Sequence, residues 1–284
     1  MRKLLYLLLL APVVTFSQND LLNEIDTTTK GNTKNYATAA FKGLKIVNFE
    51  STKLVAKKEL NFIVAHRFGN LKNGVDTFFG LDEAVTRLNF VYGLTDGINI
   101  GVSRSSFLKI YEASLKYRLA RQVEGGFPLT IVGFNAILAN TSLRNDDFPG
   151  IDFSNKLGYT SQLLISRKVN TNLSLQVAPT VIHEGLVDAR TDNNTQAAIG
   201  IGGRYKLTKR WSINVDYGAL INKDSASPLK NPLSIGFDLE TGGHVFQLHF
   251  TNARGINTNS FIGRTTEDWL DGGIFFGFNL GRTF

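Results

Sequence analysis

The chain has 284 residues, of which 43% are hydrophobic and 19% charged, so it is neither a disordered tail nor a bundle of transmembrane helices. The formal net charge is +7, and there is no cysteine, which excludes a disulfide scaffold, thiolate metal sites, a cysteine nucleophile and covalently attached haem. The 27 glycines and 21 phenylalanines favour a β protein with many turns and close backbone contacts.

The N-terminus has the pattern of a secretory signal peptide. Arg2 and Lys3 precede an apolar run over 4–14, and small residues up to Ser17 lead to a cleavage site. The run is too short for a spanning helix, which needs about 20 residues. The sequence therefore predicts a signal peptide over 1–17 and export of the remainder. Because no cysteine stands at the cleavage site, a lipid anchor is excluded.

Residues 18–58 precede the first predicted strand. The part up to residue 40 is polar and has no periodicity, which favours a periplasmic arm. The part after it has two interpretations. Because Leu44, Ile46 and Val47 need cover, it could fold inward as a short plug, or it could simply lead into the first strand. We favour the lead-in.

From residue 59 onward, about twelve segments alternate apolar and polar residues, the pattern of strands with two different faces. In the clearest, Trp211, Ile213 and Val215 alternate with polar side chains. The least regular segment is 128–139, where Ile131 and Val132 fall on opposite faces. The predicted strands are 59–67, 84–93, 98–105, 110–119, 128–139, 157–168, 172–182, 196–207, 211–221, 232–240, 244–252 and 272–284.

The lengths of strands and connections distinguish a membrane barrel from a soluble sandwich. Most segments exceed the roughly 5–6 residues common in soluble proteins and suit the about 9–11 that a tilted membrane strand needs. Connections after odd-numbered strands are long, apart from 106–109, and those after even-numbered strands are short. The sequence predicts an all-β fold over 59–284: a transmembrane, antiparallel, up-and-down β-barrel of about twelve strands, within a range of roughly 10–14.

The end of the chain and several internal segments resemble known outer-membrane proteins. The last strand ends on the aromatic Phe284, like the C-terminal signal read by barrel-assembly machinery, which indicates outer-membrane lipid as the surroundings. As a set, the stretches 41–48, 60–69, 93–97, 243–252 and 277–282 resemble a membrane-bound β-barrel domain family of Gram-negative bacteria. The resemblance implies an outer-membrane barrel over nearly the whole mature chain and no assigned activity.

If the apolar faces contact lipid, the polar faces line the lumen. Basic groups outnumber acidic ones there, which favours small anionic solutes if the lumen is open. Four glycines on the lumen side, Gly200, Gly202, Gly218 and Gly236, leave space and favour a narrow pore or binding barrel over a packed core. The candidate pore-lining residues are Arg67, Arg87, Glu112, Lys116, Arg118, Arg204, Asp216, Asp238 and His249.

Two other functions stay open at this point. A closed structural barrel would present its loops or its N-terminal arm to a partner protein. An outer-membrane hydrolase would need His183 or His249 beside a nucleophile, yet no G-x-S-x-G motif accompanies them. The sequence has no zinc spacing, phosphate loop or dinucleotide fingerprint, and its basic residues are scattered along strands. We therefore expect no catalysis, metal, cofactor or nucleic-acid partner.

Overall fold

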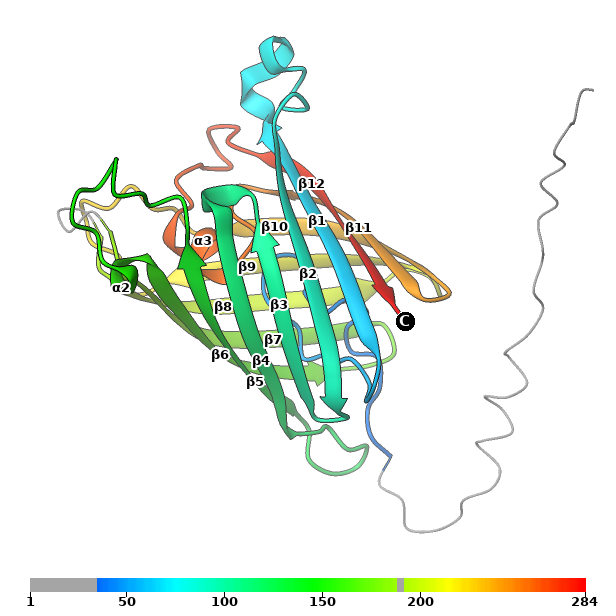
Figure 1. Cartoon of the computed structure of the whole chain (residues 1–284). Helices are drawn as coiled ribbons and strands as arrows, with labels where there is room; N and C mark the ends of the chain where they lie inside the picture. The colour runs from blue at the N-terminus through cyan, green and yellow to red at the C-terminus, as the bar shows by residue number, and fades with distance from the viewer. Residues whose placement is uncertain (1–34, 188–191) are drawn as a thin grey trace, which may run out of the picture. The chain divides into compact units, whose positions relative to one another are not determined.

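The computed structural model describes residues 35–187 and 192–284, which form a barrel of twelve strands (Figure 1). The predicted signal peptide over 1–17 and most of the predicted arm lie outside the described residues. The predicted number and order of strands are confirmed, and their ends differ from the prediction by at most three residues. The strands are β1 Leu60–Asn70, β2 Ala84–Thr95, β3 Ile98–Ser105, β4 Ile110–Ala120, β5 Thr130–Asn140, β6 Leu157–Lys168, β7 Leu173–Glu184, β8 Thr195–Lys206, β9 Trp211–Leu220, β10 Leu233–Thr241, β11 His244–Thr251 and β12 Phe275–Thr283.

Each strand pairs antiparallel with its neighbours in sequence, and β1 pairs with β12 to close the sheet. The backbone of Leu60 exchanges two hydrogen bonds with that of Phe284, so the start of β1 and the end of the chain lie at the same end. Closure leaves no unpaired sheet edge, which is the property that the predicted up-and-down barrel requires. None of the helices among the described residues is long and apolar enough to cross a membrane.

The two ends of the barrel carry different connections. At the end where the chain terminates, which we call the short-turn end, the connections are 96–97, 121–129, 169–172, 207–210 and 242–243. At the opposite, long-loop end, most connections are longer and hold short helices: η1 Leu71–Thr77, η2 Phe107–Lys109, α2 Phe153–Lys156 and α3 Thr258–Gly263. The predicted alternation of loop lengths is therefore present.

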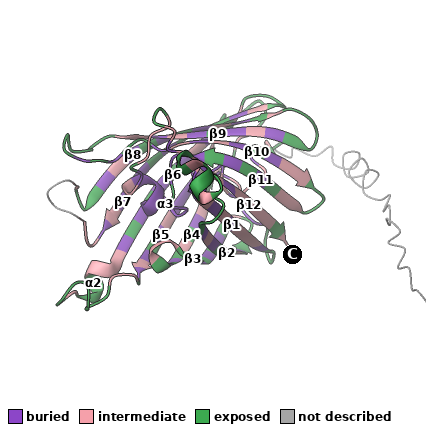
Figure 2. Cartoon of the chain, turned by 90° about the horizontal axis from the view of Figure 1, so that it is seen from above, coloured by how far each residue is buried: buried purple, intermediate pink, exposed green. Residues whose placement is uncertain are grey.

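The outer face of the barrel is apolar. Side chains such as Leu88, Val102 and Ile201 are exposed there, while their neighbours along each strand point inward and are buried. Figure 2 shows the resulting alternation of exposed and buried residues along the strands. Exposed apolar residues in such number cover an outer surface suited to lipid.

The lumen is filled from the short-turn end by residues 41–55, which we call the plug. Ile46, Val47 and Phe49 are each 1% exposed. The segment, drawn in blue, passes through the inside of the barrel (Figure 1). The interpretation of these residues as a simple lead-in was wrong, and the inward-folded plug is what the structure contains. The physical reason is that their apolar side chains find cover only inside the barrel.

A second segment enters from the long-loop end. The connection between β11 and β12 brings α3 into the ring of strands, where Phe261 and Ile262 are fully buried (Figure 2). The rings of Phe49 and Phe261 meet edge to face, with centroids 4.8 Å apart. The plug and the α3 loop therefore contact each other inside the barrel.

This contact explains the irregular alternation of the segment predicted at 128–139. The inward side chains of β5 include Val132, Phe134 and Leu138, all buried. Val132 and Phe134 belong to the same apolar cluster as Phe49 and Phe261. The strand is thus apolar on both faces, with lipid on one side and the two filling segments on the other.

Candidate functional site

Asp216 of β9 anchors the plug to the wall. One carboxylate oxygen, Oδ2, accepts hydrogen bonds from the backbone N–H groups of Val47, Asn48 and Phe49 at 2.9, 2.7 and 3.0 Å. Hydrogen bonds to a charged acceptor are stronger than neutral ones. Asp216, predicted to line a pore, therefore faces the lumen as expected but anchors the segment that fills it.

Ion pairs hold the middle of the plug. Glu50 of the plug lies between Lys116 of β4 and Lys45, with N–O distances of 2.7 and 3.0 Å. On the adjoining wall, Arg87 of β2 pairs with Glu112 of β4 at 2.6 Å. All five groups are shielded from water, so their charges act at short range with little screening. Two of the predicted lumen cations are thus neutralised, Lys116 by the plug and Arg87 by the wall.

Arg67 of β1 joins the plug to the α3 loop. Its Nη1 donates to the carbonyl oxygens of Ala253 and Gly255 at 2.7 and 2.6 Å, and its Nη2 donates to Oδ1 of Asn48 at 2.8 Å. Nη2 also lies 3.3 Å from Nε2 of His249. Both predicted residues lie in the lumen, where Arg67 is only 1% exposed. The rigid guanidinium fork is what lets one side chain reach both segments.

Replacing Arg67 with lysine should therefore destabilise the folded barrel by about 1–2 kcal/mol, because an ammonium keeps the charge but cannot reproduce the fork. The measurement is urea unfolding in detergent micelles, in which the folded fraction is read from the heat-dependent shift on a gel. Arg210→Lys is the control, since Arg210 lies in an exposed short turn. Equal midpoints for wild type and Arg67→Lys would contradict the role of the fork.

The remaining predicted residues lie nearer the short-turn end. Asp238 of β10 accepts a 2.6 Å hydrogen bond from Nε2 of Gln247, which also donates to the carbonyl oxygen of Ile46 in the plug. Arg204 of β8 donates to Ser212 and, at 3.4 Å, to the carbonyl oxygen of Ala39. Arg118 is half-buried at the end of β4. The predicted set therefore lies on the lumen side but lines a filled lumen.

The lumen glycines provide room for the plug and not for a water-filled pore. A Cβ atom on Gly202 would lie 2.6 Å from Cδ1 of Ile46, and one on Gly236 would lie 3.0 Å from Cγ2 of Val47. At Gly200 the obstacle would be the ring of Phe49, and at Gly218 it would be Cγ of Pro232 at 2.9 Å and then the same ring at 3.1 Å. The interpretation of these glycines as space for solute was wrong, because plug side chains occupy that space.

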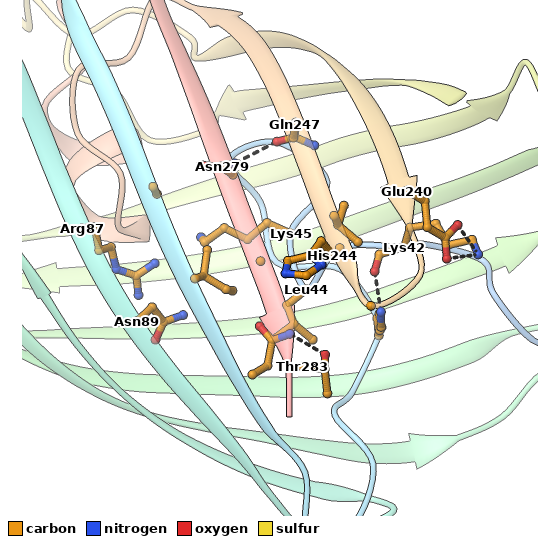
Figure 3. Close-up of a pocket in the computed structure, with 18 residues that line it drawn as sticks. Lys42, Leu44, Lys45, Arg87, Asn89, Glu240, His244, Gln247, Asn279 and Thr283 are labelled. Carbon is orange, nitrogen blue, oxygen red and sulfur yellow. Dashed lines mark hydrogen bonds and ion pairs between the residues drawn. The ribbon is translucent and has the colours of Figure 1, made fainter. Parts of the chain in front are cut away.

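A cavity of about 130 Å³ remains between the plug and the wall formed by β1, β2, β11 and β12. Figure 3 shows Arg87 and Asn89 of β2 on one side of it, Lys42 and Glu240 on the other, and Lys45 between them. Residues of the β10–β11 turn line it, so it lies toward the short-turn end. Its lining residues are Lys42, Gly43, Leu44, Lys45, Lys53, Asn61, Ile63, Ala65, Arg87, Asn89, Glu240, Gly243, His244, Val245, Gln247, Asn279, Gly281 and Thr283.

The cavity carries an excess of positive charge. A smaller cavity of about 20 Å³ adjoins it and is lined by Lys116 and Glu50. Of the described residues that line the two cavities or pair with their lining, five are cations and three are carboxylates. The cations are Lys42, Lys45, Lys53, Arg87 and Lys116, and the carboxylates are Glu50, Glu112 and Glu240. A buried excess of cations favours a bound anion.

Sequence reasoning missed the plug side of this cavity. Lys42, Lys45 and Lys53 lie in the segment taken as a lead-in, so their charges were not assigned to the lumen. The signal available was the inward-facing apolar surface of the strands, including Val132 and Leu164, which a water-filled lumen would leave exposed.

Paired charges gather at the long-loop end. Arg264 of the α3 loop pairs with Glu184 at the end of β7, and Lys72 pairs with Glu267. The backbone N–H of Leu270 and the ammonium of Lys230 lower the pKa of Asp268, which lies 3.1 Å from Lys230. These contacts fasten the α3 loop to the rim.

Within the described residues, neither candidate catalytic histidine lies in a triad arrangement. Nδ1 of His183 lies 2.9 Å from Oγ1 of Thr195 on the outer side, and His249 is buried beside Arg67. Among residues 35–187 and 192–284, no three His, Asp or Glu side chains gather in a group that could hold a metal ion.

The comparisons with known proteins agree with this architecture. Residues 41–284 match the family model described as "Membrane bound beta barrel domain (DUF5777)". The chain belongs to this family, and the matched region begins with the plug. A search of curated proteins finds no match.

Several solved barrels are similar in fold. The NanC porin has a TM-score of 0.49 at 10% identity, covering 79% of this chain and 98% of its own. The KdgM porin has a TM-score of 0.46 at 10% identity, covering 78% of this chain and 98% of its own. The COG4313 outer membrane channel from Pseudomonas putida F1 has a TM-score of 0.49 at 13% identity, covering 82% of this chain and 97% of its own. These are likenesses of barrel architecture.

Proposed function

We propose that this protein is an outer-membrane barrel that binds small anionic solutes in its lumen and lets them pass only when the plug moves. In the outer membrane, a barrel of this kind has its short turns toward the periplasm and its long loops toward the outside of the cell. The observation that carries the proposal is the cavity in which cations outnumber carboxylates. Basic linings of narrow lumens favour anions.

The way in which the plug is held supports its displacement. It contacts the wall through side-chain hydrogen bonds and ion pairs, such as those of Asp216 and Lys116, and through apolar contacts such as those of Phe49, but it adds no strand to the barrel. Water can replace such polar contacts, whereas the strand ladder closes without the plug. Movement of the plug therefore leaves the barrel intact.

The test is conductance of the refolded full chain in a planar lipid bilayer under a potassium chloride gradient. We expect long closed periods, and open events whose reversal potential shows preference for chloride, because the cation excess attracts anions. The variant Lys53→Glu reverses a charge that forms no ion pair with the other described residues, and it should shift that potential toward zero. Lys57→Glu, in the exposed segment 56–59 between the plug and β1, is the control. Preference for potassium in the wild type would contradict the proposal.

A closed structural barrel is the second candidate, favoured by the filling of the lumen from both ends. It would present its loops or its N-terminal arm to a partner protein. Its expected result is no conductance even in variants whose plug has been released. Neither candidate assigns catalysis to His183 or His249.

A further inference from the structure

The cavity beside the plug has a second property besides its charge, and the inference drawn from it rests on the function proposed above. Part of its lining is apolar: Leu44 of the plug, Ile63 and Ala65 of β1, and Val245 of β11. An inorganic anion would leave this surface against water or empty space. A solute with a charged head and a short apolar body would cover it.

One cation of the cavity is available to such a head. Lys42, Lys45 and Arg87 each pair with a carboxylate. Lys53 forms no ion pair with any carboxylate in the described part of the chain, and its Nζ donates to the carbonyl oxygen of Lys42 at 2.5 Å. An ammonium has three N–H groups, so Lys53 keeps donors for a ligand.

A polar atom of β1 also lacks a partner at this site. Asn61 is 9% exposed, and its Nδ2 donates to Oγ1 of Thr283, while its Oδ1 has no hydrogen-bond partner among residues 35–187 and 192–284. A buried amide left half-satisfied is costly; because Oδ1 only accepts, a hydroxyl or N–H group on the body of a bound solute would complete it, whereas a carboxylate could not. The cavity volume of about 130 Å³ limits that solute to a few carbon atoms.

We infer that the cavity binds small aliphatic carboxylates, with the carboxylate on Lys53 and the alkyl chain against Leu44, Ile63 and Val245. Lys53 then determines the charge of the ligand, and Ile63 limits its length. Large anions such as nucleotides or oligosaccharides exceed the space beside the closed plug.

The test is isothermal titration of the folded full chain in neutral detergent, with sodium butyrate as the probe, at constant ionic strength. We expect saturable binding of butyrate and none of butyramide or butylamine. Lys53→Gln should weaken binding by about tenfold or more, the effect of losing one hydrogen bond to a charged group. Lys57→Gln, whose side chain is exposed outside the cavity, should bind like the wild type.

A second variant tests the apolar side independently. Ile63→Ala enlarges the cavity and should shift the preference from butyrate toward hexanoate, with folding verified by the heat-dependent gel shift. Binding of inorganic phosphate but not butyrate would overturn the carboxylate class and leave the anion-binding function standing. Binding of no anion, together with cation-selective conductance, would overturn both. Unchanged butyrate binding by Lys53→Gln would overturn the assignment of the head group.

Discussion

Replacing Asp216 with asparagine is expected to release the plug and convert a mostly closed barrel into a conducting one. The carboxylate holds three successive N–H groups of the plug, and asparagine removes the charge and one acceptor oxygen. Hydrogen bonds to a charged group are worth about 1.5–3 kcal/mol each and those to a neutral amide oxygen about 0.5–1.5, so the three together should lose roughly 3–5 kcal/mol. The measurement is the open fraction in planar bilayers.

Cysteine labelling provides a readout of the same event that does not depend on ion flow. The chain has no cysteine, so Val47→Cys introduces a single thiol at a buried position of the plug. It should resist a maleimide reagent in the wild-type background and react in the Asp216→Asn background. Asp224→Asn, in an exposed loop, is the matched control. A thiol that stays protected in Asp216→Asn would show that this carboxylate does not hold the plug.

Replacing Gly200 with valine should displace the plug by collision. Gly200 faces the ring of Phe49 so closely that an added side chain has no room. Overpacking of this kind costs about 1–3 kcal/mol, and the plug is the part that can move. We expect more frequent open events in bilayers and an otherwise folded barrel, judged by its heat-dependent gel shift. Gly203→Val, on the outer face of the same strand, is the control.

A second substitution distinguishes displacement from misfolding. In the Gly200→Val background, Phe49→Ala removes the ring that collides with the new side chain and should return the channel to its closed state. The two substitutions would then show strong non-additivity, as expected for residues in contact. Additive effects would mean that Gly200 and Phe49 act independently.

The fold could be predicted from the sequence because two local signals coincide. Alternation along strands such as β9 places Trp211 and Val215 outward and Asp216 inward. The lengths of the connections show which strand ends lie at the short-turn end and which at the long-loop end. Both signals depend on residues close in sequence. The lumen location of Arg67, Arg87 and Asp216 follows from the same parity.

The contents of the lumen could not be predicted in that way. Whether Lys116 lines a pore or pairs with Glu50 depends on a contact between residues 66 positions apart, and parity carries no information about it. The plug itself is too short and irregular for periodicity. Inward apolar residues such as Val132 and Leu164 need something apolar to cover them, and this was the only indication of a plug. These residues belong to the wall, so they do not show which segment covers them.

The plug immediately precedes β1, and β1 forms the seam with β12. The plug is therefore joined to one of the two strands that close the barrel. Because it is joined to β1, the plug stays beside the short-turn end of the lumen while the seam forms, so it can enter at that stage. During assembly the sheet can then curl around its own N-terminal segment, which shields Val132 and Leu164 from water before the ring is complete. In this way the segment that blocks passage in the finished protein serves as a core for building it.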